Sequence, residues 1–98
     1  MVDRSIDNSL CFGAYDDGGQ VGFARVVTDR ATFAHLMDVF VVSDRRGRGM
    51  GKALMRAVME HPDLQGLRKF TLHTADAHSL YEEFGFRRVE SLDLLMEL

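Results

Sequence analysis

The stretch from Val39 to Met55, VFVVSDRRGRGMGKALM, constrains the fold of this chain more than any other. Apolar β-branched and aromatic residues lead into a charged turn, then glycines at alternate positions, then apolar residues at helical spacing. This order predicts a strand, a loop and a helix. Glycine lets the backbone approach a ligand closely, and the first amides of a helix lack helical acceptors and attract anions. We therefore predict a phosphate-binding loop here.

Basic side chains gather around the same loop, although the chain has a net charge of −3. They are Arg45, Arg46, Arg48 and Lys52. General nucleic-acid binding needs a basic face over much of a domain, so this charge pattern argues against it. The local cluster favours a small phosphate-bearing ligand.

The length of 98 residues predicts one small domain spanning 1–98. The single cysteine, Cys11, allows neither an internal disulfide nor a cysteine-only metal site, so we expect a cytoplasmic protein with this residue buried in a strand. No stretch has the length and apolar character of a membrane span, and Met1-Val2-Asp3-Arg4 does not begin a signal peptide. We expect neither a membrane nor a nucleic-acid partner.

Three strands are predicted before the loop and mixed elements after it. The first three, Ser9 to Tyr15, Gln20 to Thr28 and Thr32 to Val42, are joined by turns at 16–19 and 29–30 and form an antiparallel meander, the third being long enough to bend or bulge. The helix has an apolar stripe of Met50, Ala53, Leu54, Ala57 and Val58, and it stops at His61 because Pro62 follows.

The remaining residues predict a strand, a short helix and two closing strands. These are Leu67 to Thr74, Ala77 to Phe84 with Gly85 as its cap, Phe86 to Glu90 and Leu94 to Leu98. Because a helix separates the fourth strand from the third, the two should be parallel with a right-handed crossover. The predicted fold class is α+β, with a mixed sheet.

Two common phosphate motifs fail at the glycine loop. A Walker A loop needs glycine where the chain has Arg46 and serine or threonine where it has Ala53. A dinucleotide fingerprint needs glycine at Lys52 and a place in the first β-α unit. A nucleotide-binding regulator is therefore disfavoured.

The remaining pattern, Arg46-x-x-Gly49-x-Gly51, resembles the pyrophosphate loop of the GNAT superfamily of acyl-CoA N-acyltransferases. A second match follows in the right order, where Tyr81, Gly85 and Phe86 fit the family's Tyr-x-x-x-Gly-Phe pattern at the end of a short helix. The resemblance covers roughly Ser9 to the C-terminus. It implies a GNAT-like fold.

The resemblance also marks a departure, because family members usually begin with a strand and two helices that precede the meander. Three explanations are a natural short form, a partial gene product, and a protein that completes its fold by pairing. We expect a homodimer, because apolar residues such as Phe12 or Phe23 would otherwise be left on an open sheet face.

The resemblance implies acetyl-CoA as cosubstrate and no metal. The residues it assigns to acetyl-CoA are Phe40 and Val41, through the main chain of the strand end, then Arg46, Gly47, Arg48, Gly49, Met50, Gly51 and Lys52 around the pyrophosphate, and Thr74 where many members have asparagine. We expect the side chains of Phe40 and Val41 to be core, and Asp76 to cap the short helix.

Catalytic roles are also implied by the resemblance. Tyr81 matches the general acid that protonates the leaving thiolate; the alternative is an aromatic that only packs its helix on the sheet. His35 matches the position of a side-chain base, and Asp38 ranks after it, while many relatives pass the proton through water. Alternation puts His35, Met37, Val39 and Val41 on one face, so His35 and Asp38 can share a site only across a bulge.

These residues lead to a predicted acetyl transfer from acetyl-CoA directly to a primary amine, on a small molecule or a peptide, without an acyl-enzyme. The alternative is a catalytically weak acyl-CoA-binding module that acts through a partner. His73 and His78 lie near the second motif, but no carboxylate or cysteine is placed to complete a metal site.

Overall fold

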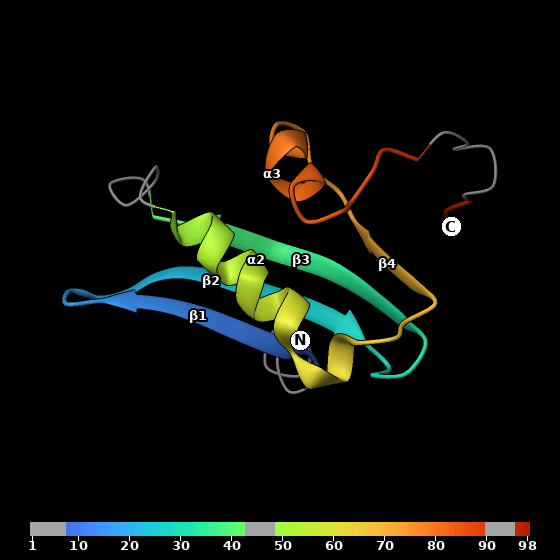
Figure 1. The fold of residues 1–98 in the computed structure, drawn as a ribbon, viewed down its shortest axis with the longest axis horizontal. Coiled ribbons are helices and arrows are strands. Elements are labelled where there is room, and N and C mark those ends of the chain that lie inside the picture. The colour runs from blue at the N-terminus through green and yellow to red at the C-terminus, as the bar shows by residue number, and fades with distance from the viewer. Residues whose placement is uncertain (1–7, 43–48, 90–95) are drawn as a thin grey trace.

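The computed structural model describes residues 8–42, 49–89 and 96–98 of the chain. Its elements in order are β1 (Leu10–Asp16), β2 (Gly19–Thr28), β3 (Phe33–Val41), α2 (Met50–Glu60), the short 3₁₀ helix η2 (Pro62–Leu64), β4 (Lys69–Leu72) and α3 (His78–Glu82) (Figure 1). The three-strand meander, the crossover helix and the short second helix are confirmed. The fourth strand and the second helix are shorter at both ends than predicted.

The strands form one mixed sheet in the order β1-β2-β3-β4. β1, β2 and β3 pair antiparallel, whereas β3 and β4 pair parallel through four positions from Phe33↔Lys69 to Leu36↔Leu72. Asp17 and Gly18 separate β1 from β2, and Gly19 has a positive φ of 108°, which favours glycine at this position. The parallel pair after an intervening helix agrees with the predicted crossover.

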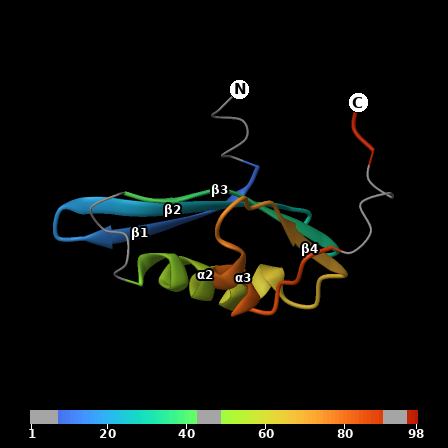
Figure 2. The same ribbon diagram turned by 90° about the horizontal axis from the view of Figure 1, so that it is seen from above.

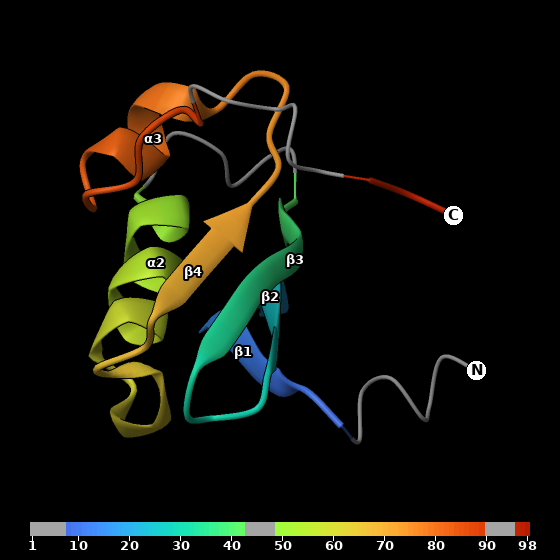
Figure 3. The same ribbon diagram turned by 90° about the vertical axis from the view of Figure 1, so that its right-hand side faces the viewer.

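Both helices lie on the same side of the sheet, as Figures 2 and 3 show from two directions. The covered face of the sheet, turned toward α2, holds the buried residues Ala24, Val26, Ala34 and Leu36. From α2, Leu54, Met55 and Val58 are buried against them. Ala53 and Ala57 are exposed, so the buried face of α2 is rotated around the helix axis from the predicted apolar stripe. Helix α2 turns the larger Met55 to the sheet, which removes more apolar surface from water.

Side chains along each strand point alternately to the covered face and to the opposite face, which is here called the open face. Cys11 and Arg25 are paired across β1 and β2 on this face, so the expected burial of Cys11 is wrong and the thiol is exposed. Phe23 also lies here, with its ring 6.0 Å from that of Phe40. Phe12 packs against the core instead, because it lies on the face that α2 covers.

A bulge interrupts β3 near Asp38. Phe23 pairs with Phe40 and Arg25 with Met37, so one residue of β2, Ala24, opposes two of β3, Asp38 and Val39, and Asp38 has a positive φ of 57°. The extra residue reverses the alternation, so that Val39 and Val41 pack against the core. The predicted grouping of His35 with Val39 and Val41 is therefore wrong, although the predicted bulge is present.

The predicted closing strands are absent from the described residues. Residues 86–89 of the first, and 96–98 of the second, are not in a strand. Gly85, with a φ of 95°, ends α3 as predicted, and the amide of Phe86 returns to the carbonyl of Tyr81. The Phe86 ring packs edge-on against Phe70, with centroids 5.4 Å apart. This contact covers part of the Phe86 side chain without a strand at this position.

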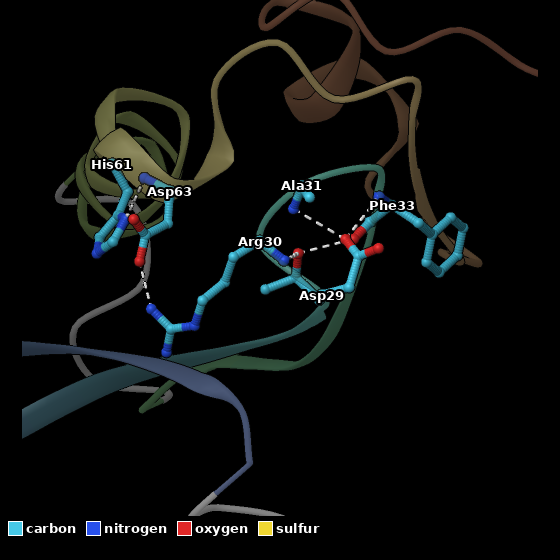
Figure 4. A network of polar contacts seen from close by, with 7 residues as sticks. Asp29, Arg30, Ala31, Phe33, His61 and Asp63 are labelled. Carbon is cyan, nitrogen blue, oxygen red and sulfur yellow. Dashed lines mark hydrogen bonds and ion pairs between the residues drawn. The ribbon is translucent and has the colours of Figure 1, made fainter.

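The turn from β2 to β3 is tied to η2 (Figure 4). The carboxylate of Asp29 accepts hydrogen bonds from the amides of Ala31, Thr32 and Phe33. The guanidinium of Arg30 forms an ion pair with Asp63 of η2. α2 ends before His61, whose ψ of 131° is extended, as predicted from Pro62. The turn therefore fixes the end of the helix layer over the sheet.

Candidate functional site

Strands β3 and β4 separate at the centre of the candidate site. Their last pair is Leu36↔Leu72, and Met37 to Val41 of β3 extend beyond it. The Val41 side chain packs against the core, as predicted, but Phe40 is 49% exposed on the open face and is not core. The bulge is the reason, because it fixes which of these two neighbours faces α2.

Helix α2 begins beside this separation. Gly49 has a positive φ of 79°, which a side chain disfavours, and its carbonyl accepts the first helical hydrogen bond from Ala53 at 2.9 Å. The amides of Met50, Gly51 and Lys52 lack helical acceptors because they open the helix. The predicted positions Arg46, Gly47 and Arg48 lie outside the described residues.

Gly51 and Lys52 connect this helix start to α3. A Cβ added at Gly51 would lie 3.5 Å from Cδ2 of Leu80, which is an ordinary contact. Packing therefore does not require glycine at this position. Nζ of Lys52 lies 3.3 Å from Oε2 of Glu83, so the lysine faces α3 and its charge is partly balanced.

Helix α3 directs Tyr81 into the core, where the residue is 8% exposed. Burial raises the pKa of the phenol, and the charge of Asp76 raises it further. The phenol carries its proton near neutral pH, as an ordinary tyrosine does, so it has a proton to donate. Tyr81 also lines a cavity of about 470 Å³ that Thr74 and Leu72 border.

Thr74, rather than Asp76, bonds the backbone at the start of α3. The Thr74 hydroxyl accepts a hydrogen bond from the amide of Ala77 at 3.0 Å, and no side chain caps the helix from its N-cap residue, Ala77. The predicted capping by Asp76 is therefore wrong, because the helix begins one residue later than expected and Thr74 reaches the amide first. Thr74 and Tyr81 line the same cavity.

His35 lies on the open face at the last part of the β3–β4 pairing. Its Nδ1 is 2.6 Å from Oγ1 of Thr71, the residue paired with it on β4. The rings of His35 and His73 have centroids 5.1 Å apart. Burial lowers the pKa of His35, and His73 lowers it further. The imidazole is therefore mainly neutral near pH 7, which allows it to accept a proton.

Asp38 lies on the same face but is already engaged. Its Oδ2 is 2.8 Å from Nε of Arg25, and Arg25 also reaches Oγ of Ser9 at 3.0 Å. The bulge thus brings the two candidate bases to one face, as alternation alone would not. His35 is the candidate whose ring retains a nitrogen, Nε2, for a substrate.

Thr71 is the residue at this site that the sequence analysis missed. It occurs inside the predicted strand Leu67 to Thr74, where threonine is a common residue and does not by itself indicate a site. The signal that could have found it is the parallel register, because a strand pair that places Thr71 beside His35 makes a side-chain hydrogen bond between them possible.

Two negative findings concern the part of the chain that the structure describes. Within residues 8–42, 49–89 and 96–98, no group of three or more histidine, cysteine, aspartate or glutamate side chains could hold a metal ion. Over the same ranges, no helix has the length and apolar character needed to cross a membrane.

Comparison with known proteins gives a consistent result. A family model described as the acetyltransferase (GNAT) domain matches residues 7–88. A candidate acetyltransferase of Gibberella zeae is 30% identical over 111 residues, which cover 91% of this chain and 62% of that protein. The chain thus spans less than two thirds of the length of this relative.

Two solved structures also resemble the chain. A candidate acetyltransferase of the GNAT family from Xanthomonas campestris pv. campestris is 61% identical, with a TM-score of 0.92 over 99% of this chain and 68% of that one. One from Deinococcus radiodurans R1 is 26% identical, with a TM-score of 0.77 over 93% of this chain and 64% of that one. The mixed sheet and its two helices are shared with these proteins.

Proposed function

The chain belongs to the GNAT acetyltransferase family, and we propose that it transfers an acetyl group from acetyl-CoA directly to a primary amine. The acceptor is a small molecule or a peptide. Acetyl-CoA supplies the thioester that carries the acetyl group. The residues of this chain hold that cosubstrate, accept the proton of the amine and donate a proton to the departing thiol.

The start of α2 fits a pyrophosphate group. Gly49 adopts a backbone conformation that favours glycine, and the amides of Met50, Gly51 and Lys52 are available as donors at the positive end of the helix dipole. Glycine inside a helix costs roughly 1 kcal/mol relative to alanine. Since packing at Gly51 would admit a Cβ, we attribute this glycine to close approach by the cosubstrate.

Tyr81 and His35 have opposite protonation preferences. Tyr81 is protonated near neutral pH, as any tyrosine with an ordinary or raised pKa is, whereas the lowered pKa of His35 leaves its ring neutral. Tyr81 belongs to the core on the helix side of the sheet, and His35 lies on the open face. This separation of an acid from a base, beside strands that diverge, is the observation that carries the proposal.

Calorimetric titration with acetyl-CoA, desulfo-CoA and ATP tests the cosubstrate. We expect binding to both CoA forms in the micromolar range and none to ATP, because the loop fits neither nucleotide motif. Failure to bind either CoA form would contradict the proposal. An amine panel with detection of released thiol then tests transfer.

Gly51→Ala separates a ligand role from a structural one. We expect unchanged or slightly higher stability against urea, since alanine favours a helix, together with roughly tenfold or greater loss of acetyl-CoA affinity from the lost amide contacts. Ala57→Gly is the reverse control on an exposed position of the same helix, and it should lower stability without changing affinity. Equal acetyl-CoA affinity in Gly51→Ala and the wild type would overturn the loop assignment.

Tyr81→Phe tests the proton donor. General acid catalysis contributes about 10²- to 10⁴-fold, so we expect kcat to fall within that range while acetyl-CoA binding is retained. Tyr15→Phe is the matched control, because Tyr15 is 67% exposed and far along the chain from this site. If the two variants keep equal kcat values, Tyr81 only packs its helix on the sheet.

A further inference from the structure

The open face carries a polar cluster that the proposed function uses only in part. His35 and Thr71 are partners in the parallel register of β3 and β4. His73 follows Thr71 by two residues and lies just beyond the end of β4. Nδ1 of His35 lies 2.6 Å from Oγ1 of Thr71, and the His35 and His73 rings meet edge-on at 66°. Two imidazoles and one hydroxyl thus form a contiguous group.

We propose that Thr71 is a positioning residue for His35, and that His73 is the neighbour whose positive charge opposes protonation of His35. This inference rests on the proposed function, in which His35 accepts the proton of the amine. Thr71 accepts a hydrogen bond from Nδ1–H, so the lone pair of the neutral ring resides on Nε2. The bond also fixes the ring orientation, because rotation would break it.

The proton transfer assigned to this cluster balances. The amine nitrogen forms its new bond to the acetyl carbon and gives up one proton, which the Nε2 lone pair of His35 takes. His35 becomes an imidazolium that keeps Nδ1–H on Thr71. The nearby charge of His73, when that exposed residue is protonated, then favours return of the proton to solvent. The C–S bond of the thioester breaks, the departing thiolate takes its proton from Tyr81, and the phenolate left on Tyr81 regains a proton from solvent.

The surroundings of His35 support this arrangement. Val27 of β2 lies opposite His35. On β3, Phe33 and Met37 lie two residues before and after His35 and share its face. From β4, Lys69 and Thr71 share its face, and His73 follows just after the strand. Arg25 and Asp38 are also on this face, but each engages the other at 2.8 Å. Lys69 is thus the basic side chain of β4 on this face, and the ring of His73, just after the strand, is the neighbour whose charge opposes protonation of His35.

Nuclear magnetic resonance of the histidine ring nitrogens tests the tautomer without any acceptor amine. In the wild type we expect His35 to carry its neutral-state proton on Nδ1. Thr71→Val keeps the shape but removes the acceptor, so His35 should shift toward the Nε2–H tautomer, while Thr71→Ser should restore the wild-type tautomer. An Nε2–H tautomer in the wild type would overturn the proposal, because the hydroxyl would then be the donor.

Titration of the same signals tests His73. His73→Gln removes the charge that disfavours a proton on His35, so the pKa of His35 should rise, and His78→Gln is the matched control that should leave it unchanged. An unchanged pKa of His35 in His73→Gln would exclude the electrostatic role. Because these readouts need no turnover, they distinguish failure of this inference from failure of the proposed function.

Kinetics with an amine found in the panel provide the second measurement. Thr71→Val should lower kcat roughly 10- to 100-fold, with little change in the KM for acetyl-CoA, and Thr71→Ser should recover most of the loss. In His73→Gln the acidic limb of the kcat/KM profile should move to higher pH, since deprotonated His35 is the active form. Equal pH profiles and rates in these variants and the wild type would show that the cluster has no part in transfer.

Discussion

The two faces of the sheet differ in side-chain size and chemistry more than in apolar character. The covered face has small residues, Gly22, Ala24 and Ala34, among larger aliphatic ones, and this lets α2 approach closely. The open face has large side chains, including Phe23, Met37 and Phe40, together with titratable groups. An apolar face therefore does not become a core unless its shape admits a second layer.

The strongest test of this difference is a matched pair of methionine truncations. Met55 is fully buried and Met37 is 38% exposed on the open face. Met55→Ala should lower the free energy of unfolding by about 2–5 kcal/mol through lost burial and a cavity, whereas Met37→Ala should cost about 0.5 kcal/mol or less. Urea denaturation measures both. Equal losses would mean that the open face is covered in solution.

A matched pair of glycine substitutions gives a smaller effect. A Cβ at Gly22 would lie 3.1 Å from Cδ1 of Leu54 and 3.3 Å from the carbonyl oxygen of Phe40, so Gly22→Ala should cost about 1–3 kcal/mol. A Cβ at Gly13 would instead meet the exposed ring of Tyr15, which can swing away. Gly13→Ala should be neutral or stabilise slightly by restricting the unfolded chain. Equal midpoints in urea would contradict the close packing assigned to the covered face.

The turn at Asp29 anchors one end of the helix layer that covers the sheet. The stability of this covered face should therefore depend on pH through the Asp29 carboxylate. Hydrogen bonds from Thr32, first its side chain and then its amide, hold the pKa of Asp29 well below its usual value. The carboxylate therefore contributes stability above the unfolded pKa, about 4, that is lost as the pH falls below it.

Urea midpoints at several pH values between 7 and 3 measure this effect. Asp29→Asn should reduce the loss of stability on acidification. Asp17→Asn, in the turn between β1 and β2, is the control and should follow the wild type. Parallel acid profiles for Asp29→Asn and the wild type would exclude Asp29 as a source of the pH dependence.

The homodimer stays a prediction, and the variant that tests it should change the free energy of unfolding least of all. Phe40→Ser should alter the stability of one chain little, since the side chain is 49% exposed. If two copies associate through their open faces, this variant should sediment as a monomer at micromolar concentrations where the wild type is dimeric. Val89→Ser is the control at another exposed apolar position. A wild type that sediments as a monomer at these concentrations would argue against pairing.

The sequence predicted those parts of the fold that depend on local order. Turn residues and alternation located the meander, and Pro62 and Gly85 marked two helix ends correctly. The predicted closing strands do not form in the described residues 86–89 and 96–98, because a strand needs a partner that the sequence does not name, and the Phe86 ring packs against Phe70 instead. Cys11 was misplaced because alternation shows that two faces exist, not which of them a helix covers.

The candidate site was predictable to a similar extent. Gly49 and Tyr81 were found from local patterns, and the structure gives each a distinctive conformation or environment. Thr71 was missed because its partner, His35, is distant in the chain and the two meet only through the parallel register. Thr74 replaced Asp76 at the start of α3 because a shift of one residue in the helix start changes which side chain reaches the amide.

The bulge at Asp38 changes which residues of β3 face each side of the sheet. Counting by twos assigns faces correctly on each side of this residue, but the two counts are out of step by one. Deleting one residue here would invert the rest of β3, turning Val39 and Val41 to the open face and Phe40 to the core. A single extra residue therefore decides which side chains at the end of β3 face α2 and which face the open side.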